Sequence, residues 1–153
     1  MTELRAWQKE AFEAWRAAGS RGIVEAVTGT GKTRVGVAAM LAARSVNQQV
    51  LVVVPTIDLL EQWFTEVKNL LPSVSVGRRG NGHKDDFRHS SILISTIQSA
   101  IMRGAPQPRP GALLVADEVH RYGTDGFARV FSDRFDHRLG LTATLERQDE
   151  GVD

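Results

Sequence analysis

The chain contains no cysteine, and it has no apolar run of the roughly 20 residues needed to cross a bilayer. Without cysteine there are no disulfides, no thiolate metal ligands and no cysteine nucleophiles. The first residues, Met1 to Arg5, lack the apolar stretch of a signal peptide. We therefore expect an intracellular, cytoplasmic protein without a membrane partner, and the nucleus stays open as a compartment.

A strong charge of either sign is also missing. The 19 Lys and Arg residues stand against 18 Asp and Glu residues, which gives a net charge of +1. This balance neither supports nor excludes nucleic-acid binding, because one local basic face is sufficient. At 153 residues, of which 42% are hydrophobic, the chain suits one globular domain with a substantial core.

Apolar, strand-like runs alternate with helix-like segments along the chain. Helical spacing is present over 4–18, closed by Gly19, from Lys32 to about Arg44, from Thr56 to Leu71, and over about 125–132. Strands are expected at 23–27, 50–54, 74–76, 92–94, 113–116 and 138–141, and a proline-rich surface loop at 104–111. The alternation predicts an α/β fold with a mostly parallel sheet, helices on both faces, and ligands at the carboxyl ends of the strands.

A glycine-rich loop follows the first expected strand and opens a helix. Its glycines let backbone amides face an anion, and the helix adds the positive end of its dipole. Lys32 can reach the β- and γ-phosphates, and the Thr33 hydroxyl can ligate Mg²⁺. The sequence therefore predicts a phosphate loop, although Ala26 stands where the common pattern has glycine. The expected phosphate-binding residues are Thr28, Gly29, Thr30, Gly31, Lys32 and Thr33.

Two adjacent carboxylates end the apolar run at 113–116. A nucleotide hydrolase needs one carboxylate to hold Mg²⁺ and another group to orient and deprotonate the attacking water. Asp117 fits the first role, together with Thr33, and Glu118 fits the second. Two acids at a strand end are by themselves more often a solvated turn. The phosphate loop in the same chain favours the catalytic interpretation, with Lys32, Asp117 and Glu118 as catalytic residues.

These residues resemble the motifs of superfamily 2 helicases and translocases, in the family's order and over nearly the whole chain. Asp117 to His120 is similar to their DExH box, and Leu139 to Leu145 is similar to the motif that couples the nucleotide to nucleic acid. The longer run to Arg147 is most like that of XPB-type DNA repair translocases and of related phage and restriction motors. The resemblance implies one RecA-like P-loop domain over 1–153, ATP and Mg²⁺ as cofactors, and coupling roles for His120, Thr142 and Thr144.

One polar residue lies on the apolar stripe of the first expected helix. Gln8 shares this stripe with Leu4, Ala11 and Trp15 and needs a hydrogen-bonding partner. In the family, a glutamine in such a pattern reads the adenine edge, so the resemblance implies that Arg5 and Gln8 belong to the cofactor site. The residues alone leave a second interpretation open, in which Gln8 lies at the edge of the core and bonds to the backbone.

Three further segments are candidates for nucleic-acid contacts. The resemblance assigns two of them, one with Pro55, Thr56 and Gln62 and one with Thr96 and Gln98, whose hydroxyls and helix starts suit backbone phosphates. Simple N-capping by the two threonines is the alternative, and one residue can do both. The third is an expected flexible basic loop, 77–84, in which Arg78 and Arg79 can either grip phosphates or lie solvated at the surface.

The resemblance implies half of a motor. Superfamily 2 motors complete their site with arginines from a second RecA-like domain, and the sequence has no such domain after the Thr142-Ala143-Thr144 motif. We expect ATP binding with very weak hydrolysis, and DNA is favoured over RNA as the partner. The second domain would come from a longer parent chain or from another chain. A small-molecule kinase and a non-catalytic nucleic-acid-binding regulatory module are the rival interpretations.

Overall fold

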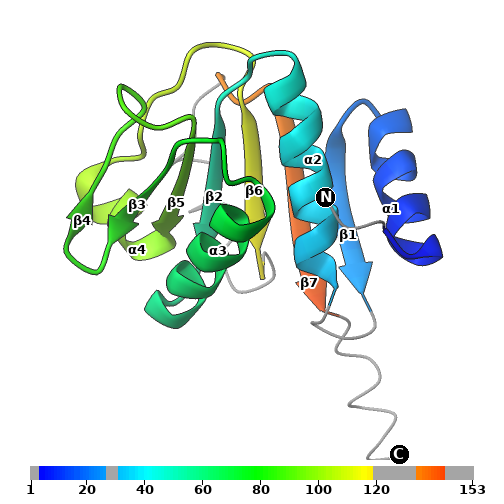
Figure 1. The fold of residues 1–153 in the computed structure, drawn as a ribbon, viewed down its shortest axis with the longest axis horizontal. Coiled ribbons are helices and arrows are strands. Elements are labelled where there is room, and N and C mark those ends of the chain that lie inside the picture. Colours follow the sequence, from blue (N-terminus) through cyan, green and yellow to red (C-terminus); the bar gives the residue numbers. More distant parts are fainter. Residues whose placement is uncertain (1–3, 27–30, 119–133, 144–153) are drawn as a thin grey trace, which may run out of the picture.

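The computed structural model describes residues 4–26, 31–118 and 134–143, which form a seven-stranded sheet with flanking helices (Figure 1). The strands lie in the order β1-β7-β6-β2-β5-β3-β4, and each pair is parallel except β3–β4. The helices are α1 (Ala6–Ala17), α2 (Lys32–Ser45), α3 (Ile57–Leu70) and α4 (Ile97–Arg103). The strands are β1 (Arg21–Ala26), β2 (Val50–Val54), β3 (Val76–Gly80), β4 (His83–Lys84), β5 (Ile92–Thr96), β6 (Leu113–Asp117) and β7 (His137–Ala143).

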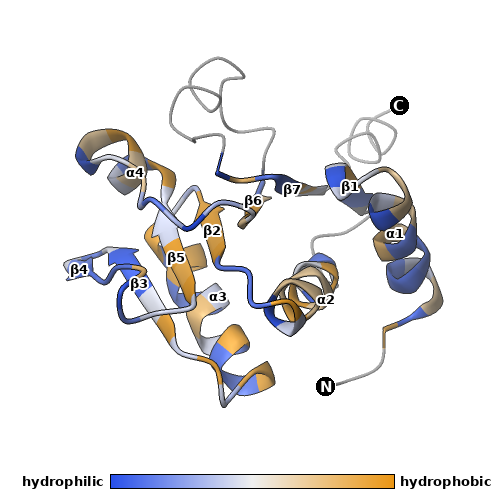
Figure 2. Cartoon of the chain, turned by 90° about the horizontal axis from the view of Figure 1, so that it is seen from above, coloured by the Kyte–Doolittle hydropathy of each residue, from blue (hydrophilic) through white to orange (hydrophobic). Residues whose placement is uncertain are grey.

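The two faces of the sheet carry separate cores. Alternate strand residues such as Val52, Ile94 and Val115 pack against α1, α2 and α3 on one face. Their neighbours, among them Val53 and Leu114, pack on the other face, where α4 lies (Figure 2). Because successive side chains of a strand point to opposite faces, a strand buried on both sides needs an unbroken apolar run, as β2 has. The α/β fold with helices on both faces is confirmed.

Most of the expected elements are present within one or two residues of their predicted bounds. Thr56 caps α3, since its side-chain oxygen accepts a hydrogen bond from the Leu59 amide at 3.2 Å. The segment 104–111 contains no helix or strand, as predicted, although Pro106 and Pro108 in it are buried. The helix expected over about 125–132 lies outside the described residues. No helix among the described residues has the length and apolar character needed to cross a membrane.

The expected basic loop at 77–84 is wrong, because these residues form the β3–β4 hairpin. The strand expected at 74–76 starts only at Val76 and continues through the arginines, pairing with β5. Backbone pairing with β5 does not require apolar side chains, so the strand extends past its last valine. Asn81 and Gly82, both with positive φ, form the turn, and Asn-Gly is the preferred pair for a two-residue hairpin. That dipeptide was a signal in the sequence for this hairpin.

Candidate nucleotide site and nucleic-acid groove

The predicted catalytic residues meet at the carboxyl edge of the sheet. β6 ends there with Asp117, and α2 begins there with Lys32. Gly31 precedes this helix with φ +91°, a left-handed conformation that glycine adopts without strain. A Cβ at this position would also lie 2.7 Å from Gln8 Nε2 and 3.0 Å from Trp7 Cζ2. Glycine is therefore required here both by the backbone and by its neighbours.

Lys32 connects the helix to both carboxylates. Its ammonium donates to Asp117 Oδ1 at 2.6 Å and pairs with Glu118 Oε2. Lys32 is 4% exposed and Asp117 is 1% exposed, so this cluster is largely removed from water. Removing charges from water is unfavourable unless they are paired, and here a cation bridges two anions. The cluster shows that the edge of the sheet accommodates a positive charge between Asp117 and Glu118.

Asp117 is held on both of its oxygens. Oδ1 also accepts the Glu118 amide at 2.9 Å, and Oδ2 accepts the indole N–H of Trp63 in α3 at 2.8 Å. Glu118 itself has φ +53°, a conformation that a non-glycine residue adopts at an energetic cost. Strain of this kind persists where surrounding contacts fix the backbone, as the Asp117 bonds do here.

A pocket of about 190 Å³ opens beside these charges. It collects the chemistry that the sequence predicted for ATP hydrolysis, because Lys32, Thr33, Asp117 and Glu118 all line it. Leu59, Gln62, Trp63 and Glu66 of α3 form the other wall. A hydroxyl and a carboxylate are hard oxygen ligands that suit Mg²⁺, which binds through one or two carboxylates together with substrate phosphates. The donor set therefore fits the metal that the resemblance implies.

Gln8 joins α1 to the start of α2. Its Oε1 accepts the Arg5 amide at 2.7 Å, and its Nε2 donates to the Gly31 carbonyl at 2.9 Å. Gln8 is 2% exposed, so the need for partners on an apolar face is met by two backbone groups. Of the two interpretations of Gln8 that the sequence left open, this is the one in which it bonds to the backbone. The contact with adenine stays a prediction, as does that of Arg5, whose guanidinium lies near Gly31.

A second hollow, a groove of about 430 Å³, lies where α3 and α4 begin. Pro55 and Thr56 line it from the start of α3, Thr96 and Gln98 from the start of α4, and Gly80 to His83 from the hairpin. Thr56 and Thr96 are both N-caps, accepting amide protons from Leu59 and Ser99. A hydroxyl that accepts such a bond still has its own proton to donate, so capping does not exhaust these side chains.

Residues 1–147 match the protein family described as "Type III restriction enzyme, res subunit". The chain belongs to this family. It is 38% identical over 150 residues to the "DNA 3'-5' translocase XPB2" of Sulfurisphaera tokodaii, covering 96% of this chain and 32% of that protein. It is 32% identical over 157 residues to the "DNA 3'-5' helicase XPB" of Mycobacterium tuberculosis, covering 96% of this chain and 27% of that protein. The chain thus spans about a quarter to a third of the length of these relatives.

A solved structure agrees on the fold. The "Sulfolobus solfataricus SWI2/SNF2 ATPase core in complex with dsDNA" matches with a TM-score of 0.75 at 22% identity, over 94% of this chain and 32% of that one. The chain therefore has the RecA-like fold that its motifs predicted. The predicted resemblance to superfamily 2 and XPB-type proteins is confirmed by the family match and the two relatives.

The remaining predicted residues lie partly at the pocket and in the sheet and partly outside the described residues. Gln62 lines the Lys32 pocket and is not among the residues of the groove. Thr142 is half-buried near the end of β7. Thr28, Gly29, Thr30, His120 and Thr144 lie outside the described residues.

The two arginines of the hairpin are engaged within the chain. Arg78 pairs with Glu61 of α3 at 2.6 Å, and its guanidinium lies 3.9 Å from the centre of the Phe64 ring. Arg79 donates to the Asp85 carbonyl at 3.0 Å. Burial raises the pKa of Glu61, but hydrogen bonds from Arg78 and Asn81 outweigh it and hold that pKa below its ordinary value. Neither arginine lines the groove, so their assignment to nucleic acid stays a prediction without support from this geometry.

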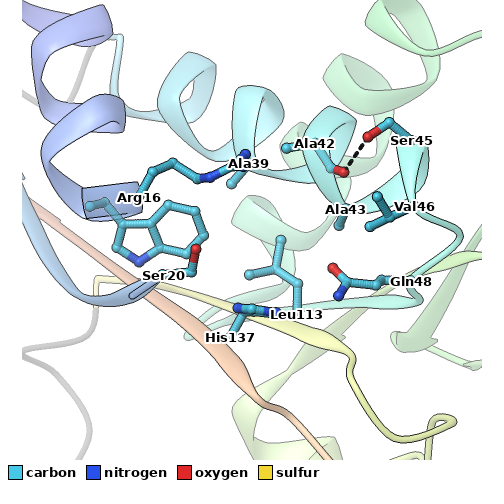
Figure 3. Close-up of a pocket in the computed structure, with 11 residues that line it drawn as sticks. Arg16, Ser20, Ala39, Ala42, Ala43, Ser45, Val46, Gln48, Leu113 and His137 are labelled. Carbon is cyan, nitrogen blue, oxygen red and sulfur yellow. Dashed lines mark hydrogen bonds between the residues drawn. The ribbon is translucent and has the colours of Figure 1, made fainter. Parts of the chain in front are cut away.

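A third pocket, of about 170 Å³, lies at the opposite, amino ends of the strands (Figure 3). Leu113 and His137, the first residues of β6 and β7, line it together with Ser45 and Val46 at the C-terminal end of α2. It contains no residue of the predicted site. Parallel α/β sheets bind ligands at the carboxyl ends of their strands. The predicted residues gather at that edge and not at this pocket.

Proposed function

We propose that the chain is the ATP-binding half of a superfamily 2 DNA helicase or translocase, which couples ATP hydrolysis to DNA binding and movement. The observation that carries the proposal is the meeting of Lys32, Asp117 and Glu118 in one pocket at the carboxyl edge of a RecA-like sheet. The names of the two relatives, a DNA translocase and a DNA helicase, support DNA as the substrate. A motor that uses ATP and DNA works inside the cell.

Each residue of the pocket has a distinct role in this proposal. Lys32 binds the β- and γ-phosphates after leaving the carboxylates with which it pairs. Thr33 and Asp117 hold Mg²⁺, which supplies positive charge against the phosphates when it is bound. Glu118 orients water toward the γ-phosphate and accepts its proton. Gln8, which donates to the Gly31 carbonyl at the end of the phosphate loop, is proposed to contact the adenine.

The groove at the starts of α3 and α4 is the proposed path of the DNA backbone. Thr56 and Thr96 can donate their hydroxyl protons to phosphate oxygens, and the first amides of α3 add positive potential. Such contacts set position and affinity without reading the base sequence. Asp58 also lines the groove and opposes phosphate binding at that point, so the path runs along the Thr56–Thr96 side.

The chain is proposed to be only half of an active enzyme. The arginines that neutralise charge at the transition state come from a second RecA-like domain in such motors, and an arginine finger is worth about 10³–10⁵ in rate. That domain would be supplied by a longer parent or by another chain. We therefore expect ATP binding with very weak turnover.

The decisive experiment measures ATP binding and hydrolysis by the chain with and without duplex DNA, beside Lys32→Ala. Binding that depends on Lys32, with little turnover, supports the half-motor. Strong DNA-stimulated turnover that is lost in Lys32→Ala would overturn the half-motor proposal, because the site would then be complete. Duplex binding without any binding of ATP would instead favour a non-catalytic regulatory module.

The DNA path is tested at Thr56 by two substitutions that both preserve the helix cap. Asp and Ser are good N-cap residues, so Thr56→Asp and Thr56→Ser should leave α3 folded. Only the aspartate places a negative charge against the phosphates. We expect Thr56→Asp to weaken duplex binding in a salt-dependent manner and Thr56→Ser to leave it nearly unchanged. Equal binding by both variants would remove Thr56 from the path.

A further inference from the structure

The Trp63 side chain in α3 directly contacts a predicted catalytic carboxylate, that of Asp117. Its indole Nε1 donates to Asp117 Oδ2 at 2.8 Å, and both side chains are almost fully buried. A charge-assisted hydrogen bond of this length in a low-dielectric setting is strong and directional. It fixes which oxygen of Asp117 points toward α3.

The indole has little freedom to move away from this carboxylate. It packs over Gly36 of α2 so closely that a Cβ at position 36 would lie 2.9 Å from Trp63 Cη2. Leu141 of β7 packs beside the same glycine, 3.4 Å from that Cβ position. Packing against Gly36 thus fixes the position of the Trp63 ring, and the hydrogen bond from the ring orients the Asp117 carboxylate. The other carboxylate oxygen, Oδ1, then faces the pocket, where the Lys32 ammonium binds it.

We propose that Trp63 is a positioning residue for the metal that Asp117 is expected to hold. With Oδ2 tied to the indole, Oδ1 is presented to Mg²⁺ in a fixed direction when the nucleotide enters. Hydrogen-bond partners of metal-binding carboxylates orient their ligands, and their loss typically lowers metal affinity by about 10–100-fold. This inference rests on the proposed function, since it requires that Asp117 holds the metal of a bound nucleotide.

A purely structural role is the competing explanation, and the chain contains its own comparison. Trp15 is also buried, and its indole donates to a backbone carbonyl, that of Arg138, at 2.9 Å. A buried indole N–H needs some acceptor, and a carbonyl in the sheet is sufficient for Trp15. The acceptor of Trp63 is instead a carboxylate of the predicted catalytic pocket. Comparing the two tryptophans therefore separates the effect of burying an indole from the effect of its hydrogen bond to Asp117.

The test uses Trp63→Phe, which removes the donor, and the double variant Trp63→Phe with Gly36→Ala. In the double variant the alanine methyl fills part of the space that the smaller ring vacates, so packing is restored while the donor stays absent. Trp15→Phe is the matched control, because it removes another buried indole N–H that lies away from the Lys32 pocket. For each variant, binding of a fluorescent ATP analogue is measured over a Mg²⁺ titration and in EDTA, with thermal unfolding alongside.

We expect both Trp63 variants to need about tenfold more Mg²⁺ for half-maximal nucleotide binding, with metal-free binding little changed. Trp15→Phe should lower thermal stability and leave the Mg²⁺ dependence as in the wild type. An unchanged Mg²⁺ dependence in a folded Trp63 variant, while the wild type binds nucleotide with Mg²⁺, would overturn the positioning role alone. Absence of nucleotide binding by the folded wild type would overturn the proposed function, and the inference would fall with it.

Discussion

Two regions of the molecule each pair a cation with a carboxylate, one pair buried and the other partly exposed to solvent. At the carboxyl edge of the sheet, the Lys32 and Asp117 side chains are 5% and 1% exposed. At the hairpin, the Arg78 and Glu61 side chains are 24% and 37% exposed and just as close, at 2.6 Å. The two pairs therefore differ in energy at equal distance, because the first is largely desolvated and the second remains partly hydrated.

The difference in exposure bears on how much each pair stabilises the fold. A buried ion pair is weak evidence for stability, since desolvation offsets much of its attraction. In the proposed function, the Lys32 cluster keeps charges in place for phosphates and a metal. The Arg78 pair, which also packs on Phe64, attaches a polar edge hairpin to α3. The two regions should consequently respond very differently to the loss of the cation.

The largest effect is expected from Lys32→Met. This change leaves the Asp117 and Glu118 carboxylates close together without their shared cation, which should lower the free energy of unfolding by about 3 kcal/mol. The value lies at the lower end for buried pairs because the adjoining pocket admits water. Urea unfolding at neutral pH measures it. A loss below about 1 kcal/mol would mean that the cluster is as well solvated as a surface pair.

A slightly smaller loss is expected from Gly36→Ala, which tests how rigidly the buried region is packed. Alanine favours a helix over glycine by about 1 kcal/mol, but its methyl would press into Trp63. Overpacking of a core costs about 1–3 kcal/mol, so we expect net destabilisation of about 1–2 kcal/mol by thermal unfolding. In a Trp63→Phe background the same change should be neutral or stabilising. Destabilisation of equal size in both backgrounds would contradict the contact.

The hairpin pair should respond less. Arg78→Met keeps an unbranched side chain but removes the charge, and we expect a loss of about 1 kcal/mol from the exposed pair and the ring contact together. Comparing urea unfolding of Arg78→Met and Lys32→Met quantifies the contrast between the regions. If Arg78→Met were as harmful as Lys32→Met, exposure would not be the property that separates them.

The smallest effect is a pH dependence at Glu61. Its pKa is lowered in the folded protein, so its stabilising contribution is present above the unfolded pKa of about 4.3 and is lost as the pH falls through the folded pKa. Because the group is exposed, we expect no more than about 0.5 kcal/mol. The difference in thermal stability between wild type and Glu61→Gln should be present at pH 7 and vanish in acid. A difference that grows in acid would have the wrong sign.

The sequence predicted what depends on local pattern and known chemistry. The run Val50–Val54 and the Thr56 cap follow from local pattern. That Lys32 and Asp117 belong to one site was expected from the phosphate loop and the resemblance, but their direct ion pair, 85 residues apart in the sequence, was not predicted. The hairpin was missed because its arginines looked solvated, whereas strand pairing, Glu61 and Phe64 accommodate them.

The contacts of Trp63 and Gln8 could not be predicted in the same way. Trp63 reaches a carboxylate 54 residues away, and Gln8 reaches a carbonyl 23 residues away. Such pairs are formed only when helices pack on the sheet in one particular arrangement. Helical spacing placed Gln8 on the apolar face of its helix, but it carries no information about which distant polar group that side chain meets.

The short strand β4 has a consequence for how the chain behaves at high concentration. It is the last strand on its side of the sheet, and it has two residues, His83 and Lys84. Long, flat edge strands invite neighbouring molecules to add to the sheet, whereas short edges that carry lysine discourage it. The Asn81-Gly82 turn thus closes this side of the sheet with a strand too short and too polar to serve as a template for aggregation.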